Sequence, residues 1–164
     1  CHMPRITEGL QQVIRTHTIH SPTKPEPIEA NQLNACNLCH TARPIRWTLE
    51  HLDDWYGKTF SQTEIRENYP QADSAMGTQW LDSSHESVRL VAFDALARTR
   101  AKWALPRMLD SLDDPFLINR QFAARSLEDW LGLSLADAGY RFVMTPEERR
   151  PVIDRLKRLL LPNP

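Results

Sequence analysis

The sequence has almost no excess charge of either sign and no long apolar run. Its 164 residues include 20 basic and 21 acidic side chains, which give a formal net charge of -1 with neutral histidines. Without a basic surplus there is no uniform positive surface for phosphate backbones, so nucleic acid is a poor candidate partner. No stretch approaches the roughly 18 apolar residues that a spanning helix needs, so we expect no membrane span.

Neither disorder nor a very small fold fits the composition. Hydrophobic residues make up 41% of the chain and charged residues 25%, which is enough apolar surface for a packed core. The length suits one compact domain, or a small domain with an extension, and we expect a soluble protein. The chain opens at Cys1-His2-Met3-Pro4 without a signal peptide, and we interpret it as a fragment or a mature piece.

Cysteine is scarce, with three in the chain, and two of them lie in the motif Cys36-Asn37-Leu38-Cys39-His40. Thiols at this spacing reach the two vinyl groups of one porphyrin, and the adjacent histidine is then placed to bind its iron. This pattern is the attachment site of c-type haem, and a proximal histidine is a standard axial ligand. The sequence therefore predicts at least one covalent haem c, held by Cys36, Cys39 and His40.

Three alternatives compete with haem attachment. A structural zinc site needs four ligands, and beyond this motif the only further thiol is Cys1, so histidines would have to complete it. A thioredoxin-like dithiol requires a strand-to-helix context, which the proline-rich approach does not offer. The third alternative is a chance occurrence with two free cysteines.

Further histidines supply candidate ligands for the sixth coordination position of a low-spin haem. His17 and His20 are the best placed, and an extended segment from Thr16 to Ser21 would point them to opposite faces, toward two different haems. The alternative is that both are solvated loop residues. His51 and His85 are interpreted as structural or surface residues.

The first forty residues are predicted as a loop-rich arm. Pro22, Pro25 and Pro27 keep the segment after His20 out of helix, because proline lacks the amide donor and biases the preceding residue toward extended forms. A short helix is predicted near Ile6 to Arg15 from apolar residues on one face.

A helix is predicted directly after the motif, from Ile45 to Tyr56, with Gly57 as its stop. Trp47, Trp55 and Tyr56 on this helix are candidates to pack beside the porphyrin, with plain core packing as the alternative. The polar stretch that follows is expected to contain a short helix around Thr63 to Glu67.

The second half of the chain repeats itself with a period of 31 residues. The period separates four pairs of matching positions: Leu81-Asp82 and Leu112-Asp113, Val88-Arg89 and Asn119-Arg120, Ala92 and Ala123, and Leu96 and Leu127. With a further helix over Leu105 to Leu112 and a turn at Asp113-Asp114-Pro115, each copy is predicted to be a helix pair that resembles a HEAT repeat.

Two copies fall short of the roughly three that stacked repeats need for independent stability, so flanking helices must cap them. One predicted cap is the last helix, with Thr145 as N-cap, Pro146 as the first helical residue, Glu148 completing a capping box, and Pro151 favouring a kink or a late start. The other predicted cap is the helix from Ile45 to Tyr56.

Several segments together resemble a known family over about residues 1 to 57. These are Cys1-His2-Met3-Pro4, then Arg15-Thr16-His17-Thr18-Ile19 with Ser21-Pro22, then Asn34-Ala35 before the motif, and Trp47 after it. They look like the doubled-motif multihaem c-type cytochromes, which are often joined to helical repeats. Cys1-His2 reads as the end of an earlier motif, although the first cysteine of that motif is not in this chain.

The resemblance implies closely packed bis-histidine haems. Cys36 and Cys39 would form the thioethers, His40 would be the proximal ligand, and His17 would match the recurrent distal histidine. Cys1 and His2 would belong to a preceding haem, with His2 as its proximal ligand.

The sequence thus predicts a mainly α protein, with a loop-rich haem c segment over residues 1–57 and a HEAT-like helical repeat domain over residues 58–164. The predicted function is electron transfer in a periplasmic or otherwise extracytoplasmic compartment, as part of a multihaem chain or larger complex with redox protein partners. We do not expect an enzyme, because two imidazoles leave no open position on the iron. A haem reductase or peroxidase component and a helical-repeat interaction subunit with a haem appendage are the alternatives.

Overall fold

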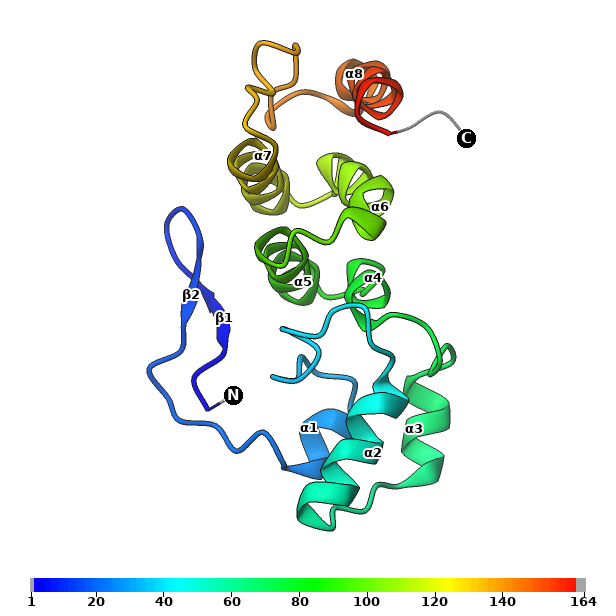
Figure 1. The fold of residues 1–164 in the computed structure, drawn as a ribbon. Coiled ribbons are helices and arrows are strands. Elements are labelled where there is room, and N and C mark those ends of the chain that lie inside the picture. The colour runs from blue at the N-terminus through cyan, green and yellow to red at the C-terminus, as the bar shows by residue number, and fades with distance from the viewer. Residues whose placement is uncertain (1, 162–164) are drawn as a thin grey trace.

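The computed structural model describes residues 2–161, and within them the protein is mainly helical with a small N-terminal β-hairpin (Figure 1). Eight α-helices lie in this part of the chain. The helices α1, α2 and α3 gather at one end of the molecule, and α4 to α8 stack away from them (Figure 1). No helix among the described residues combines the length and the apolar character needed to cross a membrane.

The segment predicted as a helix near Ile6 to Arg15 is instead a hairpin of β1 (Arg5–Glu8) and β2 (Val13–Arg15). The turn closes where the Gly9 amide donates to the Gln12 carbonyl at 3.0 Å. Packing explains the error, because Val13 is fully buried and β1 contacts the helical body, so strand pairing outweighs the helix-like spacing of apolar residues.

A second correction concerns the proline-rich segment, which contains the short helix α1 (Pro25–Glu29). Pro25 and Pro27 both fall in its first turn, where backbone amides have no partner within the helix, so the missing donors cost nothing. The Ile28 side chain is buried, and its carbonyl accepts a hydrogen bond from the Tyr69 hydroxyl.

The helix predicted after the motif is confirmed as α2 (Ile45–Tyr56). It stops at Gly57, whose φ of 59° is in the left-handed region that glycine adopts without strain. The short helix predicted around Thr63 to Glu67 is also present as α3 (Gln62–Asn68), with the Ser61 side chain accepting from the Glu64 amide.

Two helix pairs follow, and their geometry reproduces the 31-residue period. The first pair is α4 (Met76–Leu81) with α5 (Glu86–Arg98), and the second is α6 (Leu105–Asp110) with α7 (Leu117–Leu131). The 3-10 turns Lys102–Ala104 and Ser111–Asp113 flank α6. The helices α5 and α7 form one column, and α4, α6 and the last helix form the other (Figure 1).

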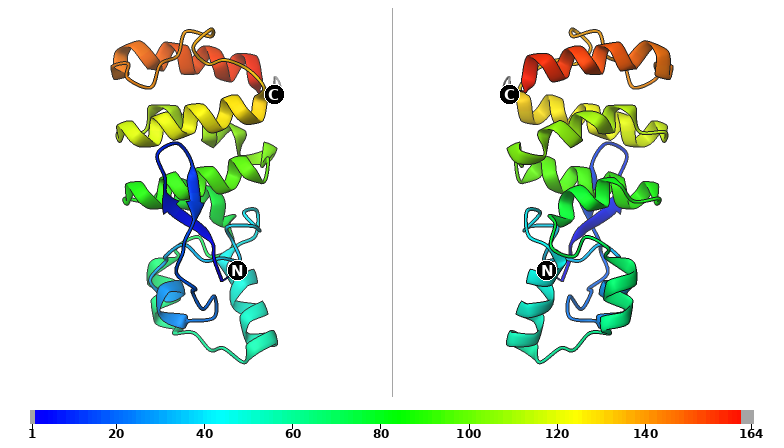
Figure 2. Two further views of the ribbon diagram at one scale, coloured as in Figure 1. Left: turned by 90° about the vertical axis from the view of Figure 1, so that its left-hand side faces the viewer. Right: turned by 90° about the vertical axis from the view of Figure 1, so that its right-hand side faces the viewer.

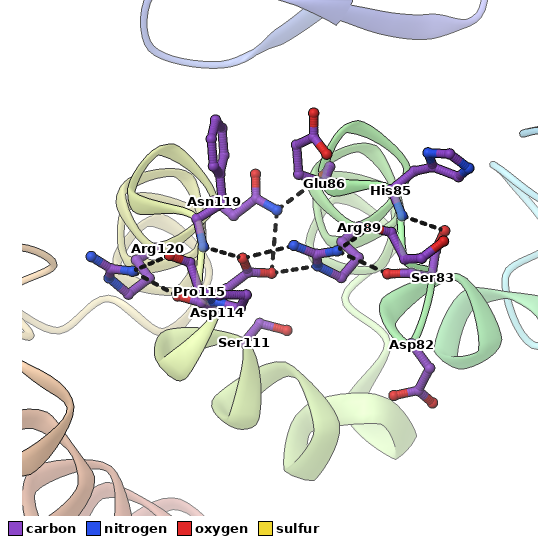
Figure 3. Close-up of polar contacts among 12 residues, drawn as sticks. Asp82, Ser83, His85, Glu86, Arg89, Ser111, Asp114, Pro115, Asn119 and Arg120 are labelled. Atoms are coloured by element: carbon purple, nitrogen blue, oxygen red, sulfur yellow. Dashed lines mark hydrogen bonds and ion pairs between the residues drawn. The ribbon is translucent and has the colours of Figure 1, made fainter.

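Arg89 and Arg120 occupy matching places in the two pairs (Figure 3). The Nη1 atom of Arg89 donates to the carbonyls of Ser83 and Ser84, and that of Arg120 donates to the carbonyls of Asp114 and Pro115. In each pair the arginine on the second helix therefore fixes the loop that precedes it, which shows that the sequence repeat is also a structural one.

The C-terminal cap is confirmed as α8 (Pro146–Leu160), which packs on α6 and the Ser111–Asp113 turn. Thr145 is the N-cap, and Thr145 and Glu148 form the expected capping box. The helix starts at Pro146 and runs through Pro151, so Pro151 does not delay its start.

The N-terminal cap differs from the prediction, since α5 is covered by β1 and α4 by the loop that follows the motif, rather than by α2. In this loop the Thr41 carbonyl accepts from the Gly77 amide at 2.9 Å and the Arg43 carbonyl accepts from the Met76 amide at 3.1 Å. A Cβ at Gly77 would lie 2.8 Å from Leu96 and 3.0 Å from the Thr41 side chain. The absence of a side chain at Gly77 lets the motif loop sit directly on the first helix pair.

Candidate functional site

Cys36, Cys39 and His40 lie together on one helix-like turn between α1 and α2. The amides of Cys39 and His40 both donate to the Cys36 carbonyl, at 3.2 and 2.8 Å. Cys39 and His40 are exposed and Cys36 is half-buried. The turn therefore presents one exposed thiol, one half-buried thiol and an exposed imidazole, and neither cysteine is engaged in a disulfide with another described residue.

The inner side of this turn is formed by Asn37 and Leu38, which are buried at 0 and 3% exposure. The Asn37 amide group donates to the Arg43 carbonyl at 2.9 Å, and its side-chain oxygen accepts from the Thr48 hydroxyl at 2.7 Å. Thr48 is a buried residue of α2. A buried polar network thus ties the turn to the following loop and helix, and such networks hold a unique conformation when every member is satisfied.

Asn34 stands at the start of the turn and has one unsatisfied group. Its Oδ1 accepts from the Asn37 backbone amide at 2.8 Å, which fixes the side-chain orientation because only oxygen can accept there. Its Nδ2 is buried and has no hydrogen-bond partner in the part of the chain that the structure describes. A buried donor without an acceptor is costly, so this site suits an acceptor supplied by another molecule.

The electrostatic setting keeps the Cys36 thiol neutral. Burial raises the pKa of Cys36, and the negative charge that Cys39 carries when ionised raises it further. At neutral pH Cys36 is therefore a neutral thiol.

Aromatic rings continue from His40 along one face of α2. The His40 and Trp47 ring centroids are 4.9 Å apart, those of Trp47 and His51 4.4 Å, and those of His51 and Trp55 4.9 Å. Trp47 is half-buried, but Trp55 and Tyr56 are 63 and 60% exposed. Core packing, the alternative reading for these aromatics, is therefore wrong for Trp55 and Tyr56.

His2 and His20 are brought together by pairing of the chain beyond the hairpin. The His20 amide donates to the His2 carbonyl at 2.9 Å, and the His2 Nδ1 lies 3.0 Å from the His20 carbonyl oxygen. A carbonyl oxygen only accepts, so Nδ1 carries the proton and Nε2 of the neutral ring keeps its lone pair. Histidines that bind a metal through one ring nitrogen often donate the other N–H to a backbone carbonyl, and the Nδ1–H of His2 makes this contact with His20.

The expected extended segment from Thr16 to Ser21 is interrupted by a bend at His17 and Thr18, where the Thr18 amide donates to the Thr16 hydroxyl at 3.1 Å. The prediction that an extended strand points His17 and His20 to opposite faces therefore has no basis in the structure, although both side chains are exposed. Cys1 lies outside the described residues.

The structure also shows the surroundings of His51 and His85 and whether metal-binding side chains gather, as a zinc site would require. His51 is half-buried between two tryptophan rings, and His85 is the exposed N-cap of α5, in line with structural or surface roles. Within residues 2–161 no three His, Cys, Asp or Glu side chains are gathered as a metal ion would require.

The supporting residues Asn34, Asn37 and Thr48 were not selected from the sequence for the roles they take in the structure. Asn34 was noted only as part of the family resemblance, and buried polar residues follow no helical or strand period that would reveal them. Comparisons with protein-family models, with curated proteins and with solved structures found no match to this chain.

Proposed function

We propose that this chain carries a c-type haem covalently at Cys36 and Cys39, with His40 as the proximal ligand, and that it transfers electrons. The observation that carries the proposal is the turn itself, which presents two free thiols and an exposed imidazole while Asn37 and Leu38 are anchored inside. A prosthetic group attached here would lie on the surface of the turn and leave its buried network intact.

The surrounding residues fit a haem. Two free thiols, one of them exposed, and an exposed imidazole are the donor set that thioether attachment and axial ligation require. The buried Nδ2 of Asn34 offers a hydrogen-bond donor that nothing in the described chain accepts. When bound, haem supplies a reversible one-electron couple at the iron. The chain supplies attachment, the axial imidazole and a rigid turn.

The sixth ligand is proposed to come from His17 or His20, both of which are exposed on the N-terminal arm. A second haem is proposed at Cys1 and His2, with His2 as its proximal ligand. The hydrogen bond from the His2 Nδ1 to the His20 carbonyl supports this, because it reserves Nε2 for iron. Two imidazoles on one iron favour electron transfer over catalysis at that iron, because no open position is left.

The helical body is proposed to be a short HEAT-like repeat domain over residues 58–164, joined to the haem segment over residues 1–57. The matched carbonyl contacts of Arg89 and Arg120 support the repeat. Stacked helix pairs commonly present a binding surface, which suits a subunit that docks redox partners within a multihaem chain or larger complex. Covalent haem attachment places the proposed site of action in the periplasm or another extracytoplasmic compartment.

The test is an absorption spectrum and an intact mass of the full chain, produced in a host that matures c-type cytochromes. We expect a low-spin haem spectrum, a pyridine haemochrome typical of thioether-linked haem, and a mass increase of one haem or more. Cys36→Ser with Cys39→Ser should abolish the covalent mass increase. A colourless protein with the mass of the bare polypeptide would contradict the proposal. Ready carbon monoxide binding by the reduced protein would favour a catalytic haem instead.

A further inference from the structure

A cavity of about 450 Å³ lies between the β-hairpin and the helical body, remote in sequence from the cysteine motif. The hairpin lies across the face formed by α5 and α7 (Figure 2, left). The charged side chains that line the cavity come from three places, namely Arg5 of β1, Asp94, Arg98 and Arg100 in or after α5, and Arg125 and Asp129 of α7. Its size falls in the range of small-molecule sites.

The cavity is positively charged, unlike the chain as a whole. Four guanidinium groups face two carboxylates, so the lining carries about two positive charges at neutral pH, whereas the chain has a formal net charge of -1. Arg98 is neutralised by Asp94, with Nε 2.7 Å from Oδ2. Beyond this pair the lining holds three cations, Arg5, Arg100 and Arg125, against the single carboxylate of Asp129. The Arg5 guanidinium donates only to the Val13 carbonyl, and the side chains of Arg100 and Arg125 have no ion-pair or hydrogen-bond partner, among residues 2–161.

Arg100 has an unusual backbone conformation for a residue with a side chain. Arg100 follows the end of α5 with a φ of 48°, which is a left-handed conformation that favours glycine. Left-handed backbone also occurs at Gly57 and Gly132, directly after α2 and α7, and at Asn31, which lies beyond the C-cap of α1 as Arg100 lies beyond that of α5. Among these four left-handed residues Arg100 is the one with a charged side chain, and it lines the cavity.

We propose that this cavity binds a small molecule that carries two or more carboxylate or phosphate groups. Arg100 and Arg125 hold its anionic groups, because guanidinium forms paired hydrogen bonds to carboxylate and phosphate oxygens. Arg5 contacts the same ligand from the hairpin side, and Trp130 and Ala97 supply apolar wall. The bound ligand joins the hairpin to α5 and α7 and so holds the N-terminal arm against the helical body.

The test uses citrate and inorganic pyrophosphate as probes in isothermal titration calorimetry with the full chain. Acetate at matched ionic strength controls for non-specific attraction, and the two probes distinguish carboxylate from phosphate recognition. We expect one or both to bind, with an affinity that falls as salt is raised. Arg125→Gln should weaken binding by roughly tenfold or more, the loss expected for a charged hydrogen bond. Arg158→Gln, an exposed arginine on α8 that does not line the cavity, is the matched control and should leave binding unchanged.

Arg100→Gly separates binding from folding. Glycine relieves the left-handed backbone, so the thermal midpoint should stay level or rise while binding weakens at least as much as in Arg125→Gln. Hydrogen exchange of the β1 and β2 amides should slow when the bound probe is added. The proposal is overturned if neither probe binds, or if Arg158→Gln weakens binding as much as Arg125→Gln. The cavity does not include the cysteine motif, so binding is expected in the Cys36→Ser, Cys39→Ser chain as well, and this result is separable from the haem test.

Discussion

Arg89 and Asp114 form a two-pronged ion pair between the helix pairs, with Nε 2.7 Å from Oδ2 and Nη2 3.0 Å from Oδ1 (Figure 3). The side chains are 15 and 6% exposed. Arg120, at the matching place 31 residues later, has no carboxylate partner within residues 2–161 and donates its Nε to the Phe142 carbonyl at 2.8 Å. The ion pair therefore joins the first helix pair to the second.

Removal of Arg89 should destabilise the protein by about 3 kcal/mol, because Arg89→Met leaves the buried Asp114 carboxylate without its cation. Asp114→Asn in the same chain should recover part of this loss, since no buried charge then remains. The measurement is a double-mutant cycle from urea unfolding. Arg120→Met combined with Asp114→Asn is the control and should show a smaller coupling energy. Equal coupling in the two cycles would contradict a specific ion pair.

High pH should destabilise the protein through its buried tyrosines. Burial raises the pKa of Tyr140 to about 12, and its hydroxyl donates to the Leu112 carbonyl at 2.7 Å. The unfolded chain ionises near the ordinary value of 10.0. This contribution to stability is therefore complete below pH 10 and is lost as the pH rises from 10 through about 12, by about 1.4 kcal/mol per pH unit.

Tyr140→Phe should reduce this alkaline slope, as followed by denaturant unfolding at a series of pH values. Part of the slope should persist, because burial also raises the pKa of Tyr69. Tyr56→Phe is the control, because Tyr56 is largely exposed, and it should leave the slope as it is. An unchanged slope in Tyr140→Phe would show that the Tyr140 hydroxyl is not protected in the native state.

The histidine ligands are tested by absorption and electron paramagnetic resonance spectra of the haem-loaded protein. His40→Ala should lose the normal iron spectrum, because the proximal imidazole is gone. His17→Ala should turn a low-spin haem into a high-spin or mixed one, and His20→Ala is the matched comparison. If both variants keep the wild-type spectrum, the sixth ligand comes from elsewhere.

Asn34→Ser should lower the reduction potential of the haem that we propose at Cys36 and Cys39. Serine can still accept from the Asn37 amide, as at a helix N-cap, but the unpaired Nδ2 donor disappears. A donor near the haem favours the reduced form, which carries one more electron. A difference of about 1 kcal/mol corresponds to roughly 40 mV for a one-electron couple. A potentiometric titration that gives the wild-type value would show that Nδ2 does not face the haem.

Local signals were sufficient for much of the helical body. The helix from Ile45 to Tyr56 was predicted because its apolar spacing ends at a glycine, and α8 because the Thr145 and Glu148 side chains form a capping box. The repeat was visible because equal spacing of arginine and small residues reflects equal geometry. Such features depend on neighbours within a few positions in the chain.

Other features depend on distant contacts and could not be read in the same way. The hairpin near Ile6 to Arg15 exists because Val13 and β1 find apolar partners on helices far along the chain. The hairpin and the loop after the motif cover the first helix pair, and the loop can approach because Gly77 has no side chain to collide with Thr41. A single glycine in the sequence does not indicate which residue will pack against it. The prolines of this segment predicted that it would not be helical, but Pro25 and Pro27 both lie in the first turn of α1, where a backbone amide donor is not needed.

The closed inner side of the cysteine turn bears on how fast the proposed electron carrier would exchange electrons. Asn37 holds Arg43 and Thr48 by hydrogen bonds that involve no water and no titratable group. Dipoles fixed in this way move little when the charge beside them changes by one unit. If the turn carries a redox group as proposed, the reorganisation energy that this part of the protein contributes is then expected to be small, so that electrons pass in either direction with little driving force.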